Sequence, residues 1–95
     1  MNALSAALIA ALLAGCSRRA TRAECDAVMD HYVEMLVREY NPSLDSSELR
    51  AQYERTRAKV AQDPSFADCP KQIRERDVRC ALRALNVAEL EQCLE

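Results

Sequence analysis

The chain has 95 residues, with 13 Lys and Arg against 15 Asp and Glu and a formal net charge of −2. This length suits one small domain, and the slightly acidic balance argues against a nucleic-acid-binding function. With one glycine, three tyrosines, one phenylalanine and no Trp, helices are favoured over hairpins, whose tight turns need positive φ. So small a core of Leu, Val, Ala and Met is expected to need cross-links.

The first 17 residues carry no charged side chain, whereas all Lys, Arg, Asp and Glu lie beyond them. Within this leader, residues 3–15 form a run rich in Ala and Leu. As a helix the run would be about 20 Å long, too short for the roughly 30 Å of hydrocarbon in a bilayer. It therefore predicts the apolar segment of an export signal rather than a transmembrane span.

The leader ends in Leu12-Leu13-Ala14-Gly15-Cys16. This stretch resembles a bacterial lipobox: an aliphatic residue, two small residues, then the cysteine that receives lipid. The resemblance implies that residues 1–15 are removed as a signal peptide. Cys16 then becomes the lipidated first residue of a mature chain of 80 residues. The competing interpretation is an ordinary N-terminal helix with a buried cysteine.

Two details bear on the lipobox resemblance. The segment Met1-Asn2 lacks the Lys or Arg that usually precedes such an apolar run, which departs from the lipoprotein pattern. Ser17, rather than Asp, follows the cysteine. By the sorting habit of these lipoproteins, Ser17 implies the periplasmic face of the outer membrane. The resemblance covers only residues 1–17 and implies nothing about the fold of the rest.

Residues 16–22 are expected to form a short tether to a domain that spans residues 23–95. Fully extended, the chain from the lipidated cysteine to Cys25 would reach about 30 Å, so the domain would stay close to the bilayer. Two interpretations of the tether's charge remain open: contact with anionic headgroups, or a solvated linker. The basic residues concerned are Arg18, Arg19 and Arg22.

The first helix of the domain is predicted over residues 22–40. Apolar residues recur there at intervals of three and four, and charged residues take the other faces. Asn41-Pro42 ends the helix, because a residue before proline is pushed out of the helical region. The predicted inward stripe is Cys25, Val28, Met29, Tyr32, Met35 and Leu36.

The second helix has the clearest start signal. Asp45 with Glu48 forms a capping-box pattern, and Leu44 with Leu49 fits a hydrophobic staple. Asp63-Pro64 ends this helix. Its expected stripe is narrow and consists of Leu49, Tyr53, Thr56 and Val60.

Residues 65–68 are expected to connect to a third helix, with Phe66 filling a gap in the core. Pro70 suits the first position of that helix, which is predicted to run to Leu85. The spacing of its apolar residues slips near Asp77, so a break there is left open. The residues expected to face inward are Ile73, Val78, Leu82 and Leu85.

A second capping-box pattern, Asn86 with Glu89, predicts a short final helix over residues 87–94. The domain is therefore expected to be all-α. We predict a small three- to four-helix bundle with two disulfides, lipid-anchored at its N-terminus.

Four cysteines remain beyond the lipobox, an even number that predicts two disulfides in an exported chain, with three possible connectivities. The helix order selects among them. The first and third helices run parallel in an up-down bundle, which places Cys25 and Cys69, each near a helix start, at one end. Cys80 and Cys93 lie at similar distances before and after the Asn86 turn. We therefore predict the pairs Cys25–Cys69 and Cys80–Cys93.

A metal site would be another use for these side chains. The sequence has no Cys-x-x-Cys or Cys-x-x-His for a zinc site. His31, between Met29 and Met35, is similar in residue types to Met/His copper sites of envelope proteins, but on a helix only Met35 lies one turn away. We expect a half-buried structural histidine and no metal ligand, and keep a copper-handling binder as the alternative function.

Enzymatic functions lack their usual residues, since the chain has one histidine, no thiol left after pairing and no Gly-rich loop. We therefore expect no enzymatic activity and no cofactor. A bundle of 80 residues is not expected to spare the roughly 300 Å³ that a ligand cavity needs, so no small-molecule substrate is expected either.

The predicted function is that of a structural or protein-interaction module of the cell envelope, bound to the membrane through its lipid. The architecture is similar to that of pilotins, small helical lipoproteins that escort secretin subunits. The expected partner is an envelope protein. The expected contact face is centred on Tyr53, an aromatic anchor ringed by Arg50, Glu54 and Arg57.

Overall fold

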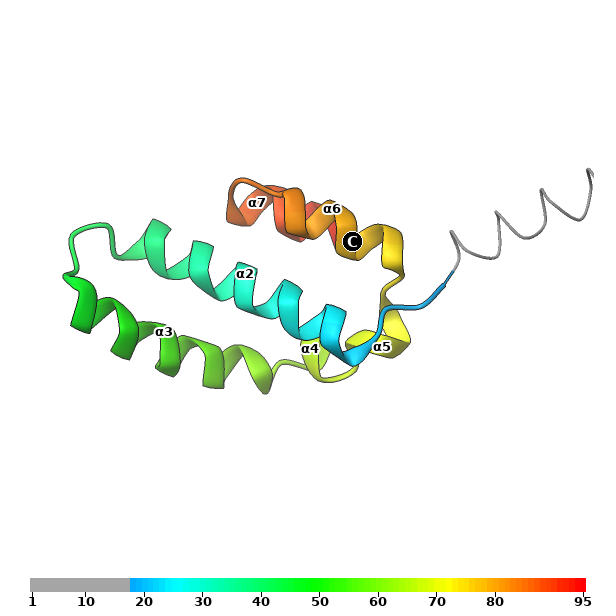
Figure 1. Cartoon of the computed structure of the whole chain (residues 1–95), viewed down its shortest axis with the longest axis horizontal. Coiled ribbons are helices and arrows are strands. Elements are labelled where there is room, and N and C mark those ends of the chain that lie inside the picture. Colours follow the sequence, from blue (N-terminus) through cyan, green and yellow to red (C-terminus); the bar gives the residue numbers. More distant parts are fainter. Residues whose placement is uncertain (1–17) are drawn as a thin grey trace, which may run out of the picture.

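The computed structural model describes residues 18–95. The predicted signal peptide and Cys16 lie outside the described residues. Figure 1 shows a helical domain whose elements are labelled in chain order. These are α2 (Arg22–Tyr40), α3 (Ser46–Ala61), α4 (Pro64–Ala67), α5 (Cys69–Gln72), α6 (Glu75–Arg83) and α7 (Val87–Cys93). In this part of the chain, no helix is both long enough and apolar enough to cross a membrane.

Helix α2 is the central element, with α3 packed on one side and the α6–α7 hairpin on the other (Figure 1). It has the predicted bounds. Thr21 begins it: the Thr21 side chain accepts a hydrogen bond from the Glu24 backbone at 3.1 Å, and Glu24 accepts one from the Thr21 backbone at 2.9 Å. The sequence analysis did not identify this capping box.

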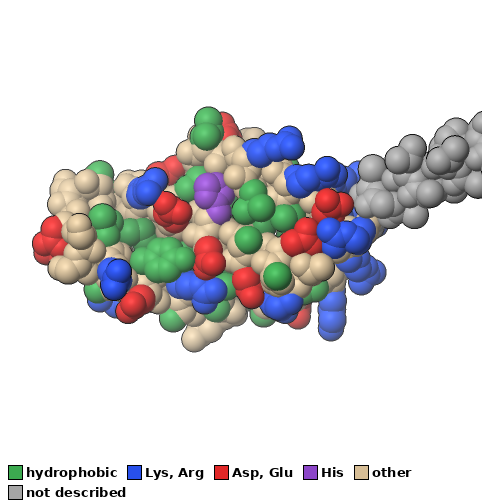
Figure 2. Space-filling view, in the orientation of Figure 1, with side chains coloured by type: hydrophobic (Ala, Val, Ile, Leu, Met, Phe, Trp, Pro, Cys, Tyr) green, Lys and Arg blue, Asp and Glu red, His purple; other side chains and the backbone are tan. Residues whose placement is uncertain are grey.

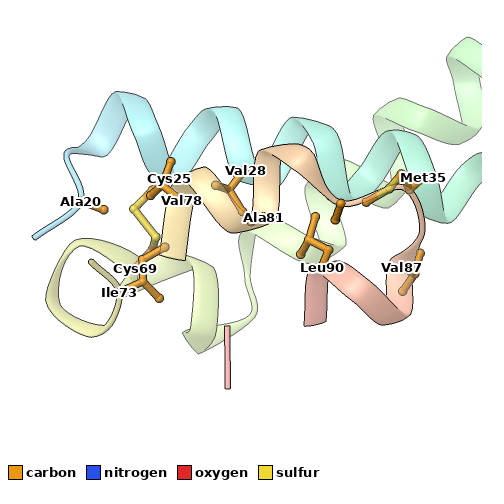
Figure 3. Close-up of a cluster of buried hydrophobic side chains, with 11 residues drawn as sticks. Ala20, Cys25, Val28, Met35, Cys69, Ile73, Val78, Ala81, Val87 and Leu90 are labelled. Atoms are coloured by element: carbon orange, nitrogen blue, oxygen red, sulfur yellow. A yellow bond between two sulfur atoms is a disulfide. The ribbon is translucent and has the colours of Figure 1, made fainter. Parts of the chain in front are cut away.

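The buried face of α2 is wider than predicted. Val33 and Val37, outside the predicted stripe, are buried together with Met29 in a cluster against α3. Cys25, Val28 and Met35 belong instead to the larger cluster that faces α5, α6 and α7 (Figure 3). Because α2 is covered on two sides, its apolar surface forms a broad arc rather than one stripe.

The start of α3 is confirmed, since the Asp45 side chain accepts a hydrogen bond from the Glu48 backbone at 2.9 Å. No α3 residue is fully buried. Leu49, Tyr53 and Val60 are partly buried against the α2 cluster, in agreement with the narrow predicted stripe. The predicted connector after α3 forms a short helix, α4.

The single third helix predicted to run from Pro70 to Leu85 is wrong. The chain forms α5 and α6, separated at Ile73 and Arg74, whose backbones are extended. The break occurs because this segment pairs with the start of the described chain: the Ala20 N–H donates to the Ile73 oxygen at 3.1 Å, and the Glu75 N–H donates to the Arg18 oxygen at 2.9 Å.

The predicted inward positions of the third helix are confirmed for Ile73 and Val78, which are buried, and are wrong for Leu82 and Leu85. Leu82 is 43% exposed and Leu85 85% exposed. The residues buried there are Ala81 and Ala84. Small side chains allow α6 to lie close to α2, and the large leucines are left on the outer side.

The final helix is confirmed, although α7 ends at Cys93 rather than Leu94. The Asn86 side chain accepts a hydrogen bond from the Glu89 backbone at 2.8 Å. The Glu89 carboxylate in turn accepts from the Leu85 backbone at 2.8 Å, one residue before the cap. The turn between α6 and α7 is therefore fixed from both sides.

Both predicted disulfides are confirmed. Cys25 and Cys69 are joined across a Cα–Cα distance of 6.0 Å, and Cys80 and Cys93 across 5.7 Å. The first disulfide lies inside the large cluster (Figure 3). It joins α2 to α5. The second disulfide joins α6 to α7 and closes that hairpin.

Candidate functional site

The side chains of Tyr53 and Arg57, two of the three predicted partner-binding residues, reach toward α2. The Tyr53 hydroxyl donates a hydrogen bond to Asp30 Oδ1 at 3.2 Å, and Arg57 Nε donates to the same oxygen at 2.8 Å. The hydrogen bond to Asp30 raises the pKa of Arg57, and burial raises the pKa of Tyr53. These contacts join α3 to α2, so Tyr53 and Arg57 have a structural role. Their role in partner binding stays a prediction.

Arg50, the third predicted residue, takes no part in the contact with Asp30. With Tyr53 it lines a shallow depression of about 290 Å³ between α2 and α3. The structure therefore brings Arg50 and Tyr53 to one small hollow, and directs Arg57 to Asp30 instead. The other residues that line the depression are Glu34, Val37, Arg38 and Leu49.

A larger groove, which the sequence analysis did not predict, runs over α2 and measures about 460 Å³. The expectation that so small a bundle leaves no opening of ligand size is therefore wrong. Helix α7 has only 7 residues, about 10 Å of helix, and covers only part of α2. The lining residues are Tyr32, Leu36, Val60, Asp63, Ser65, Phe66, Cys69, Gln72, Ile73, Glu91 and Leu94.

Tyr32 and Phe66 form the aromatic part of the groove. Their rings stack with centroids 5.4 Å apart. The Tyr32 hydroxyl donates to Glu91 Oε1 at 3.0 Å. Burial, and then this hydrogen bond, raises the pKa of Tyr32 to about 12. Phe66 fills a gap between the two core clusters, as predicted. The sequence analysis placed Tyr32, Leu36, Val60 and Ile73 on inward faces and Phe66 in the core, but no signal in the sequence placed them around one groove.

The groove combines an apolar floor with an acidic rim. Asp63 and Glu91 are its charged lining residues, and no Lys or Arg lines it within residues 18–95. Such a surface can hold apolar side chains and attract a positive charge beside them. Cys69 of the lining is in a disulfide and offers no free thiol.

His31 and the two methionines considered for copper are not brought together. His31 Nε2 lies 2.9 Å from the Ala84 oxygen, which ties α2 to the end of α6. Met29 is buried in the cluster against α3, whereas Met35 is buried in the cluster against α6 and α7. Among the described residues, no group of three or more His, Cys, Asp and Glu side chains is arranged to hold a metal ion.

The predicted tether is attached to the domain from Arg18 onward. Arg18 contacts both Glu24 oxygens, at 3.0 and 3.1 Å, and lies 3.9 Å from Glu75. The Arg18 hydrogen bond is the main cause that lowers the pKa of Glu24 to about 2. Arg22 donates to the Ala67 oxygen at 3.0 Å. Of the three tether arginines, two therefore have partners within the domain.

Comparison with known proteins finds no matching family model, no matching curated protein and no matching solved structure.

Proposed function

We propose that the protein is a lipid-anchored, non-catalytic interaction module of the cell envelope, held through Cys16 at the periplasmic face of the outer membrane. The groove over α2 is the observation that carries the interaction part of this proposal. Its aromatic and aliphatic floor lies on a scaffold with two disulfides, and a rigid surface loses little entropy when a partner binds.

The rim of the groove indicates the kind of partner. Asp63 and Glu91 border apolar side chains such as Leu36 and Leu94. A partner segment with large apolar side chains next to a Lys or Arg is complementary in both respects. We propose an amphipathic segment of another envelope protein as that partner. The depression at Tyr53 and Arg50 remains the second predicted contact face.

The anchor part of the proposal rests on the stretch Leu12–Cys16. A lipid tether confines the domain near membrane partners and raises its effective concentration there. We expect Cys16→Ser to release the protein from membranes or to leave its leader unprocessed. Intact-mass measurement of the wild-type chain tests the same point. An unacylated mature chain that begins elsewhere would contradict the anchor.

Site-specific photo-crosslinking in cells tests the contact surface. A photoreactive residue at Gln72, which is exposed and lines the groove, is expected to give one discrete adduct with an envelope protein. The same residue at Arg50 tests the face predicted from the sequence. Position 55 serves as the control, because Arg55 is exposed on α3 and lines neither hollow.

The adduct obtained at each position distinguishes between the two contact faces. An adduct at position 72 that weakens with Leu94→Ala, in a variant that keeps its helical circular dichroism, supports the groove. An adduct at position 50 alone would move the contact to the Tyr53 face. Adducts of equal strength at all three positions, including the control, would contradict a defined contact surface.

A further inference from the structure

Positive charge is concentrated at one end of the domain. Residues 18–24 and 68–79 hold seven of the 13 Lys and Arg and four of the 15 Asp and Glu. The rest of the chain holds six basic residues against eleven acidic ones. Figure 2 shows the blue side chains gathered where the described chain begins. The domain is weakly acidic overall, yet this end carries a net positive charge.

Not all of this charge is available to a partner. The guanidinium group of Arg18 is engaged by Glu24 and Glu75, and Arg22 binds backbone oxygens of α4. Of the remaining acidic residues, Asp77 accepts a backbone hydrogen bond at the start of α6, and Asp68 is exposed. The exposed basic residues other than Arg18 and Arg22 are Arg19, Lys71, Arg74, Arg76 and Arg79.

Two of these exposed residues have free side chains. Within residues 18–95, no hydrogen bond or ion pair involves the side chain of Arg19 or of Lys71. Arg76 makes only a long contact of 3.9 Å with the neighbouring Asp77. These three therefore face solvent at the same end of the domain without a strong internal partner.

The bridge between Arg19 and Arg74 fixes this end relative to the proposed anchor. Because residues 18–20 pair with residues 73–75, the domain begins at Arg18, two positions after Cys16 in the sequence. That span reaches about 7 Å at most, far less than the length expected of a tether that ran to Cys25. A lipid on Cys16 would hold the basic end beside the headgroups.

We propose that this basic end, formed by residues 18–22 and 68–76, is a docking surface for the anionic lipid headgroups of the membrane that carries the anchor. The inference rests on the proposed lipidation of Cys16. Beyond the lipidation, the inference gives the domain one orientation on the membrane: α5 faces the bilayer, and the loop between α2 and α3 points away. Each basic residue near an anionic surface increases the binding constant for that surface about fivefold.

The only two lysines of the chain, Lys59 and Lys71, provide an internal comparison. Both are exposed, one on α3 and one on α5 at the basic end. The purified acylated protein is inserted from detergent into preformed vesicles of phosphatidylcholine, with or without phosphatidylglycerol, so that the domain faces outward. A water-soluble amine reagent then labels both lysines, and peptide mass spectrometry gives their relative rates.

On vesicles with phosphatidylglycerol, we expect the labelling of Lys71 relative to Lys59 to fall about fivefold or more from its value in detergent. Phosphatidylcholine alone should give a smaller fall. Charge reversal by Arg19→Glu with Arg76→Glu should remove the protection that phosphatidylglycerol adds. The matched control, Arg55→Glu on α3 with Arg83→Glu at the end of α6, changes two exposed residues outside the basic end and should leave it unchanged.

Three results would overturn the inference. An unchanged labelling ratio on anionic vesicles would show that the domain moves freely on its anchor. Equal protection of both lysines would show that it lies on its side. If intact mass shows no acyl group on the starting protein, the proposed anchor fails and this inference fails with it. With an acylated protein, the first two results leave the proposed function standing.

Discussion

The Tyr32 hydroxyl donates a hydrogen bond to Glu91 Oε1 at 3.0 Å and so joins two residues that are 59 positions apart. The bond connects the middle of α2 to the end of α7 beside the groove. The Tyr32 ring stacks on Phe66 at the same time. One side chain thus holds together three segments that line the proposed contact surface.

Replacement of Tyr32 by Phe keeps the ring and removes this hydrogen bond. We expect the free energy of unfolding to fall by about 1 kcal/mol, the usual value for one such bond. Urea unfolding measures the change. Tyr40→Phe is the matched control, because Tyr40 is 75% exposed and should lose much less. An equal loss in both variants would show that the Glu91 contact does not stabilise the fold.

Burial of Tyr32, together with this hydrogen bond, predicts that stability depends on pH in the alkaline range. Because the folded state raises the pKa of Tyr32 to about 12 from the model-compound value of 10.0, the neutral phenol is favoured by folding. Its contribution is complete below about pH 10 and is lost as the pH rises toward 12. The difference in stability between wild type and Tyr32→Phe should shrink over that window. A constant difference would contradict the assignment.

The acidic side of the pH scale depends on Glu24. Its pKa is lowered from 4.5 to about 2, first by the hydrogen bond from Arg18 and then by the backbone of Thr21. The ionised form is therefore favoured by folding. Its contribution is present above about pH 4.5 and is lost as the pH falls through 2. Because the Glu24 carboxylate is partly exposed and solvent screens its charge, the effect should be small, with stability falling as the pH falls.

Urea midpoints of wild type and Glu24→Gln, measured between pH 6 and pH 2, test this. The wild type should lose stability more steeply with falling pH, and the two curves should converge at the acid end. Glu54→Gln serves as control: it removes the same charge from an exposed site on α3 and should run parallel to the wild type. If the curve of Glu24→Gln also runs parallel to that of the wild type, the ionised carboxylate of Glu24 does not stabilise the fold.

Local chemistry explains which parts of the fold could be predicted. Asp45 and Asn86 cap helices through bonds to residues three positions away, so their patterns can be read in the sequence. The pairing of Cys25 with Cys69 followed from helix order, which depends on the positions of helix starts and ends. These features do not require knowledge of distant contacts.

Most of the features that were missed depend on distant contacts, although the Thr21–Glu24 capping box is a local pattern that the sequence analysis overlooked. The break at Ile73 exists because residues 18–20 pair with it, and no local signal marks that pairing. The groove is open because the short helix α7 covers only part of α2. The position of the α6–α7 hairpin on α2 depends on distant contacts. The hydrogen bond from Tyr53 to Asp30 of another helix was not predicted, because such a contact cannot be read from spacing.

The corrected register of α6 gives a further prediction. Ala81 is fully buried and Leu82 is 43% exposed. Ala81→Leu should therefore force a large side chain into the contact with α2 and lower the free energy of unfolding by about 1–3 kcal/mol. Leu82→Ala should cost only about 0.5 kcal/mol, as at other surface positions. Urea unfolding of the two variants compares them, and the opposite order would restore the register predicted from the sequence.

The two disulfides should contribute unequally to stability. They close loops with sequence separations of 44 and 13 residues, for which the chain-entropy model gives about 4 and 3 kcal/mol. The double variant Cys25→Ala with Cys69→Ala should lose more than Cys80→Ala with Cys93→Ala, because the first pair is also buried in the core. Unfolding under non-reducing conditions measures both losses. Peptide mapping of the wild type checks the connectivity, and a Cys25 link to Cys80 or Cys93 would show that the helix order is wrong.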